Sequence, residues 1–117
     1  MALVELDLEK LDLPDEGTYL GRLVDIRVTD TSVRFIFQLD GAGRLSSSYN
    51  FNHPIGLATL KRTLKNLGAT GKIVANTPEE LRNNLLWLVN TEVEAQVKHR
   101  VDKSGITRAD VTRVRKL

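Results

Sequence analysis

The fold is decided by the stretch VRFIFQLDGAG, which covers residues 33–43. Apolar side chains occupy every odd position from Val33 to Leu39, and this period of two is typical of a strand with one buried face. The sequence DGAG at 40–43 then predicts a hairpin turn. A returning strand is expected from Arg44 to about Phe51, so the stretch predicts two long antiparallel strands.

Further strands are predicted on both sides of this hairpin. Residues 18–29 are rich in Tyr, Leu, Val and Ile and predict a long strand before it. We expect one side of that strand to carry Leu20, Val24, Ile26 and Val28, and the other Tyr19, Leu23, Asp25 and Arg27. Alternation from Thr91 to Val101 and a run from Ile106 to about Val114, joined by a turn at 102–105, predict two more strands.

Two helices are predicted between the third and fourth strands. Pro54 opens the first, and an apolar stripe at three- and four-residue steps runs from Leu57 to Leu67 before Gly68 ends it. The sequence TPEE at 77–80 is a capping box with proline at the first helical position, which predicts a second, short helix. After Asn84 we expect the chain to turn β-like again.

This order predicts a mainly β protein. Three strands, a helical insertion and two strands fit a five-stranded, OB-like (oligonucleotide/oligosaccharide-binding) barrel with its helical insertion between strands 3 and 4. The chain has 117 residues, which suits one domain. We expect that domain at 17–117, preceded by an acidic N-terminal arm at 1–16.

The charge is distributed unevenly along the chain. Residues 1–16 hold six acids and one base, a net of −5, whereas residues 17–117 carry a net of +7. A basic body attracts polyanions such as nucleic acid, although a solvated mixed-charge surface is an open alternative. There is no cysteine, no secretory signal and no apolar run long enough for a membrane span, so we expect a cytoplasmic protein that does not bind a membrane.

No catalytic constellation is apparent. His53 and His99 belong to no metal or triad spacing, and no phosphate-binding glycine loop occurs. The sequence therefore predicts a protein that is not an enzyme, with no cofactor and no metal.

Single-stranded nucleic acid, in contrast, requires only cations along a surface and flat side chains for stacking. The outward positions of the hairpin strands contain arginines and no acid, and one aromatic of the returning strand is expected at the rim. The candidate binding residues are Arg34, Arg44, Tyr49, Lys61, Arg62, Lys65, Lys98, Arg100 and Arg108. We expect them to converge on one trough.

Several short motifs carry a family resemblance over residues 17–117. They are GTY at 17–19, the strand 35–39 before a glycine turn, NFN at 50–52, Leu60 to Gly68, and TPEEL at 77–81. In these features the chain resembles small phage-encoded proteins related to single-stranded DNA-binding and recombination-associated proteins. The resemblance implies an OB fold that coats single-stranded DNA in phage replication or recombination, in the host cytoplasm and alongside replication or recombination proteins.

Alternatives remain open for the function and the partners. RNA would meet the same chemistry, and a homo-oligomer is compatible with the sequence. A protein-interaction or virion-structural module with the barrel as scaffold is the second functional hypothesis. Proteins of the resembled type often end in an acidic tail, whereas this chain ends RVRKL. We therefore expect the acidic arm, residues 3–16, to lie over the basic groove until DNA displaces it.

Overall fold

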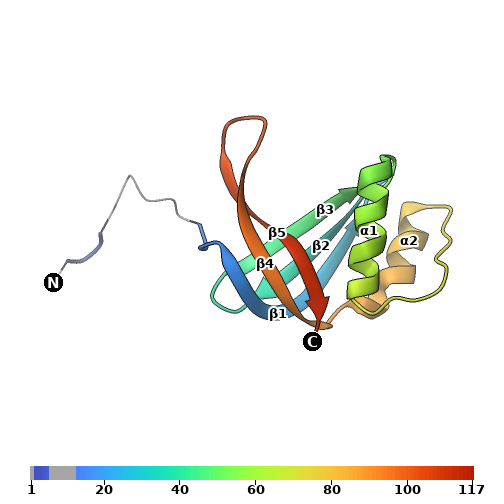
Figure 1. Cartoon of the computed structure of the whole chain (residues 1–117), viewed down its shortest axis with the longest axis horizontal. Coiled ribbons are helices and arrows are strands. Elements are labelled where there is room, and N and C mark those ends of the chain that lie inside the picture. The colour runs from blue at the N-terminus through green and yellow to red at the C-terminus, as the bar shows by residue number, and fades with distance from the viewer. Residues whose placement is uncertain (1, 6–12) are drawn as a thin grey trace.

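The computed structural model describes residues 2–5 and 13–117 and places five strands and two helices in this part of the chain (Figure 1). The sheet is antiparallel, with the strand order β3-β2-β1-β4-β5. The elements are β1 (Gly17–Val28), β2 (Ser32–Leu39), β3 (Gly43–Asn50), α1 (Pro54–Asn66), α2 (Pro78–Leu85), the 3₁₀ turn η1 (Leu86–Leu88), β4 (Glu92–Val101) and β5 (Thr107–Lys116). Both helices lie between β3 and β4 in the chain.

The sheet is curled but open. Within the described residues no hydrogen-bonded ladder joins β3 to β5, so the expected closed barrel is not confirmed. The two edge strands nevertheless approach each other, and α1 packs against both of them. The mainly β class with five antiparallel strands is as predicted.

Strand β1 holds the sheet together because it pairs with two neighbours. Its first half pairs with β4 and its second half with β2, and Gly21 pairs with both Leu39 and Val93. A Cβ atom on Gly21 would lie 2.1 Å from the carbonyl oxygen of Gln38. Only glycine therefore allows the close approach at which β1 passes from one partner to the other.

The core lies on the inner side of the curled sheet. The odd positions of β2 are buried as predicted, with Phe35 and Phe37 fully buried. The predicted sides of β1 are wrong, since Leu23 and Ile26 are both fully buried although they are three residues apart. A bulge between Leu23 and Asp25 shifts the register, and it turns both apolar side chains inward.

The predicted end of the first helix and the predicted start of the second helix are confirmed. Gly68 has φ +102° just beyond α1, and the Thr77 hydroxyl accepts a hydrogen bond from the Glu80 N–H at the start of α2. The expected return to β structure after Asn84 is wrong. The chain continues through η1 because Leu85 and Leu88, three residues apart, are both fully buried.

The hairpin of β4 and β5 projects beyond the rest of the sheet (Figure 1). Its turn is formed as predicted, with the Asp102 carboxylate accepting hydrogen bonds from the N–H groups of Ser104 and Ile106. Val93, Ala95 and Val97 are buried, but Val101 is exposed near the tip, contrary to its predicted place on the apolar side. The projection carries this end of β4 away from the core.

The base of the N-terminal arm is fixed to the sheet. The His99 N–H donates to the Glu16 carboxylate, the His99 ring lies 2.8 Å from the Pro14 carbonyl oxygen, and the Tyr19 hydroxyl donates to the Asp15 carbonyl. Leu13 packs against the core. Residues 6–12 lie outside the described residues, and they are half of the segment 3–16 that we expected over the basic groove.

We predict that Gly21→Ala lowers the free energy of unfolding by about 1–3 kcal/mol, because the added methyl group overlaps the backbone of β2. Urea denaturation followed by circular dichroism measures this change. Thr18→Ala, at an exposed position of the same strand, is the control and should change the free energy by less than about 0.5 kcal/mol. Equal effects of the two substitutions would refute the role given to Gly21.

Candidate nucleic-acid interface

The outward side of β1, β2 and β3 forms one cationic surface, which we call the cationic face. Register places Arg34 beside Arg27 of β1 on one side and beside Ser48 of β3 on the other. A second row joins Arg22, Gln38 and Arg44 across the same three strands. All four arginines are exposed. Arg34 and Arg44, both predicted, therefore share one surface.

Arg22 and Arg27 were missed by sequence reasoning. The assumed strict alternation along β1 placed Arg27 on the same side as Leu23, which is buried. The bulge next to Leu23 separates them and turns Arg27 outward. The sequence contained one signal of this bulge. Leu23 and Ile26 are both apolar but lie three residues apart, and a regular strand cannot place two such positions on the same side.

Asp25 is the only acid in these three strands, and it is already engaged. Its carboxylate accepts hydrogen bonds from the Ile26 N–H and from Arg82, and Arg27 lies 3.6 Å away. Partial burial acts to raise the pKa of Asp25, but these hydrogen bonds outweigh it and lower the pKa overall. On the β4 side the cationic face ends where Glu92 lies opposite Arg22.

Tyr49, which we predicted as a stacking residue, does not belong to this face. Its ring lies on the inner side of β3, 6.0 Å from the Phe35 ring and tilted by 58°. The Thr63 hydroxyl of α1 donates a hydrogen bond of 3.0 Å to the Tyr49 hydroxyl. The hydroxyl that we expected in water is thus bonded to α1, and the half-buried residue joins α1 to the sheet.

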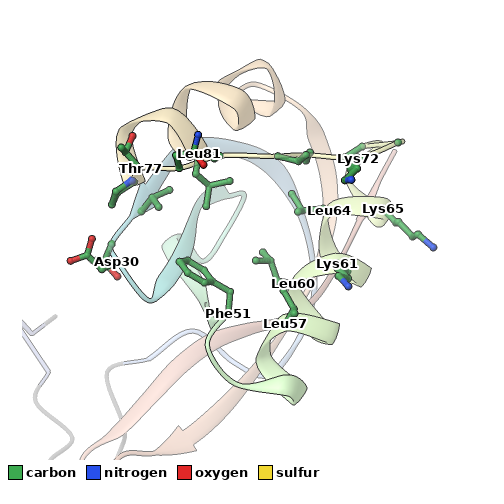
Figure 2. Close-up of a pocket in the computed structure, with 18 of the residues that line it drawn as sticks. Asp30, Phe51, Leu57, Leu60, Lys61, Leu64, Lys65, Lys72, Thr77 and Leu81 are labelled. Atoms are coloured by element: carbon green, nitrogen blue, oxygen red, sulfur yellow. The ribbon is translucent and has the colours of Figure 1, made fainter.

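The three predicted cations of α1 are exposed, and two of them border a cleft (Figure 2). The cleft has a volume of about 610 Å³ and lies between α1, the segment 69–77, α2 and the end of β1. Lys61 and Lys65 lie on one side together with Lys72, and Asp30 lies on the opposite side. Arg62 is exposed but does not line the cleft.

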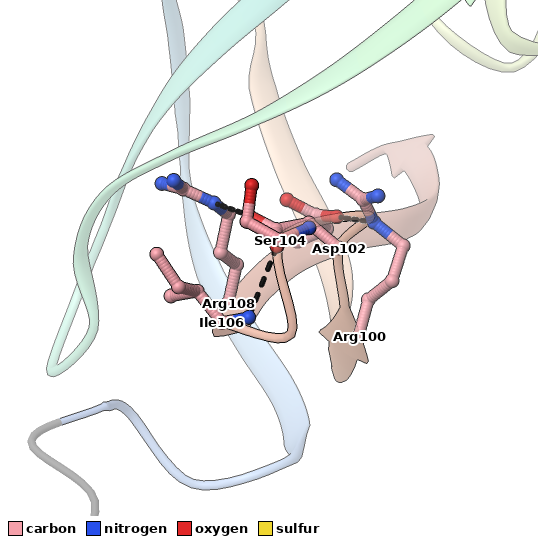
Figure 3. A network of polar contacts seen from close by, with 6 residues as sticks. Arg100, Asp102, Ser104, Ile106 and Arg108 are labelled. Atoms are coloured by element: carbon pink, nitrogen blue, oxygen red, sulfur yellow. Dashed lines mark hydrogen bonds and ion pairs between the residues drawn. The ribbon is translucent and has the colours of Figure 1, made fainter.

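The predicted arginines of the β4–β5 hairpin are neutralised within the hairpin (Figure 3). Arg108 donates to the Asp102 carboxylate at 2.7 Å, and Arg100 donates to Asp110. Both guanidinium groups, which we predicted as phosphate contacts, are thus engaged with carboxylates of the same hairpin. Lys98 is exposed, and no ion pair is found for it among the described residues.

The nine predicted residues therefore fall on separate elements. Arg34 and Arg44 lie on the cationic face, three cations lie on α1, three lie on the β4–β5 hairpin, and Tyr49 is half-buried on the inner side of β3. In residues 2–5 and 13–117 no cluster of acids and histidines suited to a metal ion occurs. Neither described helix is both long and apolar enough to cross a membrane.

Comparison with known proteins adds no family to this description. No protein-family model and no curated protein matches the chain. The inferences about function therefore rest on the geometry and the charges given above.

We predict that Tyr49→Phe lowers the free energy of unfolding by about 1 kcal/mol, since it removes the hydroxyl that accepts from Thr63. Because the substitution keeps the ring and removes only a hydroxyl that is bonded to Thr63, the affinity of the variant for single-stranded oligonucleotide should match that of the unmodified chain. Urea denaturation and fluorescence anisotropy measure the two quantities. Weaker oligonucleotide binding with unchanged stability would restore Tyr49 to the interface.

A second prediction concerns the stability of the folded protein at low pH. The Arg108 guanidinium, followed by the N–H groups of Ile106 and Ser104, lowers the pKa of Asp102. The folded protein therefore keeps this carboxylate charged at a lower pH than the unfolded chain does, and the stabilisation is lost as pH falls through the folded pKa, below about pH 4.

Asp102→Asn keeps an oxygen for the two backbone N–H groups but removes the charge. We expect the variant to be less stable than the unmodified protein at pH 6 and equal to it at the acid limit. Urea denaturation at a series of pH values measures the difference. A difference that does not change with pH would show that the charge of Asp102 contributes nothing.

Proposed function

We propose that this protein binds single-stranded nucleic acid without catalysis and holds the phosphate backbone on the cationic face. The observation that carries the proposal is the contrast between two sets of arginines. No ion pair is found for Arg34 or Arg44 among the described residues, whereas Arg100, Arg108 and Arg115 each pair with a carboxylate. Unpaired exposed arginines are free to exchange their counterions for phosphates.

The polar neighbours of these arginines support the same function. Gln38, Ser46, Ser48 and Asn50 lie on the outward side of β2 and β3, where hydroxyl and amide groups can donate to phosphate or sugar oxygens. The single acid of the three strands, Asp25, is held by Arg82 and Arg27. A phosphate chain would therefore meet donors and cations with little repulsion.

The cationic face contains no aromatic ring at an outward position of β1, β2 or β3. Binding there would depend on phosphate contacts with little base stacking. Because every nucleotide carries the same phosphate, such binding tolerates any sequence and weakens steeply with salt. Binding through phosphates alone would not discriminate between DNA and RNA.

We also propose that the sheet is an OB-like barrel whose seam between β3 and β5 is open. In support, β1 pairs with both β2 and β4, and α1 packs against both edge strands. The outer surface of β2 and β3 is the one that OB folds use for oligonucleotides. A role in phage replication or recombination follows from the resemblance alone.

We predict that Arg34→Ala combined with Arg44→Ala weakens binding of a labelled oligo-dT and flattens its salt dependence. For single strands each lost phosphate contact reduces the slope of log affinity against log salt by about 0.7, so two contacts reduce it by about 1.4. Fluorescence anisotropy at several salt concentrations measures the slope.

The matched control is Arg100→Ala combined with Arg115→Ala, which removes the same charge from arginines that are already paired. The control should keep the slope of the unmodified protein. If both double variants show the same loss of affinity and the same reduction of the salt slope, the binding depends on net charge and not on the cationic face. Absent or salt-independent binding would favour the protein-interaction or virion-structural module.

A further inference from the structure

The cleft beside α1 has the chemistry of a docking site for an acidic, leucine-rich peptide. Its floor is apolar and built from Phe51, Leu57, Leu60, Leu64 and Leu81. Leu57 and Ile73 remain exposed along it. Figure 2 shows the apolar side chains in the middle of the cleft and the three lysines along one border.

The border of the cleft is strongly cationic. Lys61, Lys65 and Lys72 are exposed, and none has an ion pair among the described residues, while Asp30 is the one acid that lines the cleft. An apolar floor is poorly matched to a phosphate backbone, which needs polar donors along its length. A peptide with both leucines and acids matches the floor and the border together.

Such a segment is present in the chain itself. Residues 1–13 carry leucine or valine at 3, 4, 6, 8, 11 and 13, with acids at 5, 7, 9 and 12. Where these residues are described, Leu3 is fully exposed and Val4 is 64% exposed, so neither side chain is buried within its own chain. Apolar side chains left in water favour a partner that buries them.

The position of the base of the arm, residues 13–16, favours the cleft of another copy over the cleft of the same copy. Pro14 and Glu16 are held by His99 at the beginning of β1, whereas Val28 and Asp30, at the other end of β1, line the cleft. An arm that returned to its own cleft would run beside a strand of 12 residues and use about as many of its own. The acids from Glu5 to Asp12 would then lie beside the strand and not in the cleft.

We infer that the acidic arm, residues 3–12, docks in the α1 cleft of a second copy of this chain. The leucines cover the apolar floor, and the acids pair with the three lysines of the neighbouring copy. Because arm and cleft lie at opposite ends of β1, each copy can give an arm and receive one, either as a reciprocal pair or along an open row. This inference does not depend on nucleic-acid binding.

Charge exchange between the two surfaces tests the inference on the chain of 117 residues. The cleft variant carries Lys61→Glu, Lys65→Glu and Lys72→Glu, and the arm variant carries Glu5→Lys, Asp7→Lys and Glu9→Lys. Sedimentation velocity over a range of concentrations, at low and high salt, measures self-association. The matched control reverses three exposed cations outside the cleft, with Lys98→Glu, Lys103→Glu and Arg113→Glu.

We expect the unmodified chain to self-associate at low salt, and each charge-reversed variant to associate roughly tenfold or more weakly, because three exposed charge pairs become repulsive. A mixture of the two variants should associate again, and the control should behave like the unmodified chain. If the cleft variant does not fold, lysine-to-glutamine substitutions at the same positions, with a smaller weakening expected, take its place.

Three results would overturn the inference. The unmodified chain could stay monomeric at every concentration, or its association could be indifferent to both charge reversals. The cleft variant could also lose oligo-dT binding while it still self-associates, which would assign the lysines to nucleic acid. Oligo-dT binding by the Arg34 and Arg44 variant does not bear on docking of the arm. The proposal of nucleic-acid binding and the inference of arm docking can therefore fail independently of each other.

Discussion

The rest of the structure depends on the close contact between β1 and β2 at Gly21. At this residue β1 pairs with β2 and β4 together, and the missing side chain leaves room for the carbonyl oxygen of Gln38. Because one strand serves two neighbours, the five strands form a single curled sheet. The curl buries Phe35 and Phe37 on the inner side and presents Arg22, Arg34 and Arg44 on one continuous outer surface.

Local ion pairing separates the cations of this basic protein into different classes. In the β4–β5 hairpin Arg100 and Arg108 pair with Asp110 and Asp102, whereas Arg113 is exposed and has no ion pair among the described residues. On the cationic face and along the α1 cleft, the described residues supply few acids. The first surface is mostly polar and suits phosphate, whereas the second surrounds an apolar floor and suits a peptide. Net charge alone could not distinguish them.

The sequence predicted the elements whose signals are local. The alternation in β2, the proline and hydroxyl cap of α2 and the glycine after α1 each depend on neighbours within a few residues, and all three are confirmed. Tertiary contacts decided the rest. The bulge after Leu23 shifts the register of β1 against β2, and the hydroxyl of Tyr49 accepts its hydrogen bond from Thr63 of α1. The ion pairs of Arg100 and Arg108 likewise depend on the register of β4 and β5, and the amino-acid composition does not reveal that register.

The position of α1 has a consequence for how copies of this protein can meet. An open sheet leaves two rows of backbone N–H and C=O groups, and such rows invite strand addition by another chain and growth into fibrils. Here the two outer strands face each other, and the helix packs on both of them. Growth by backbone pairing is thus obstructed at the margins of the sheet, and reversible contacts through side chains become the available route to assembly.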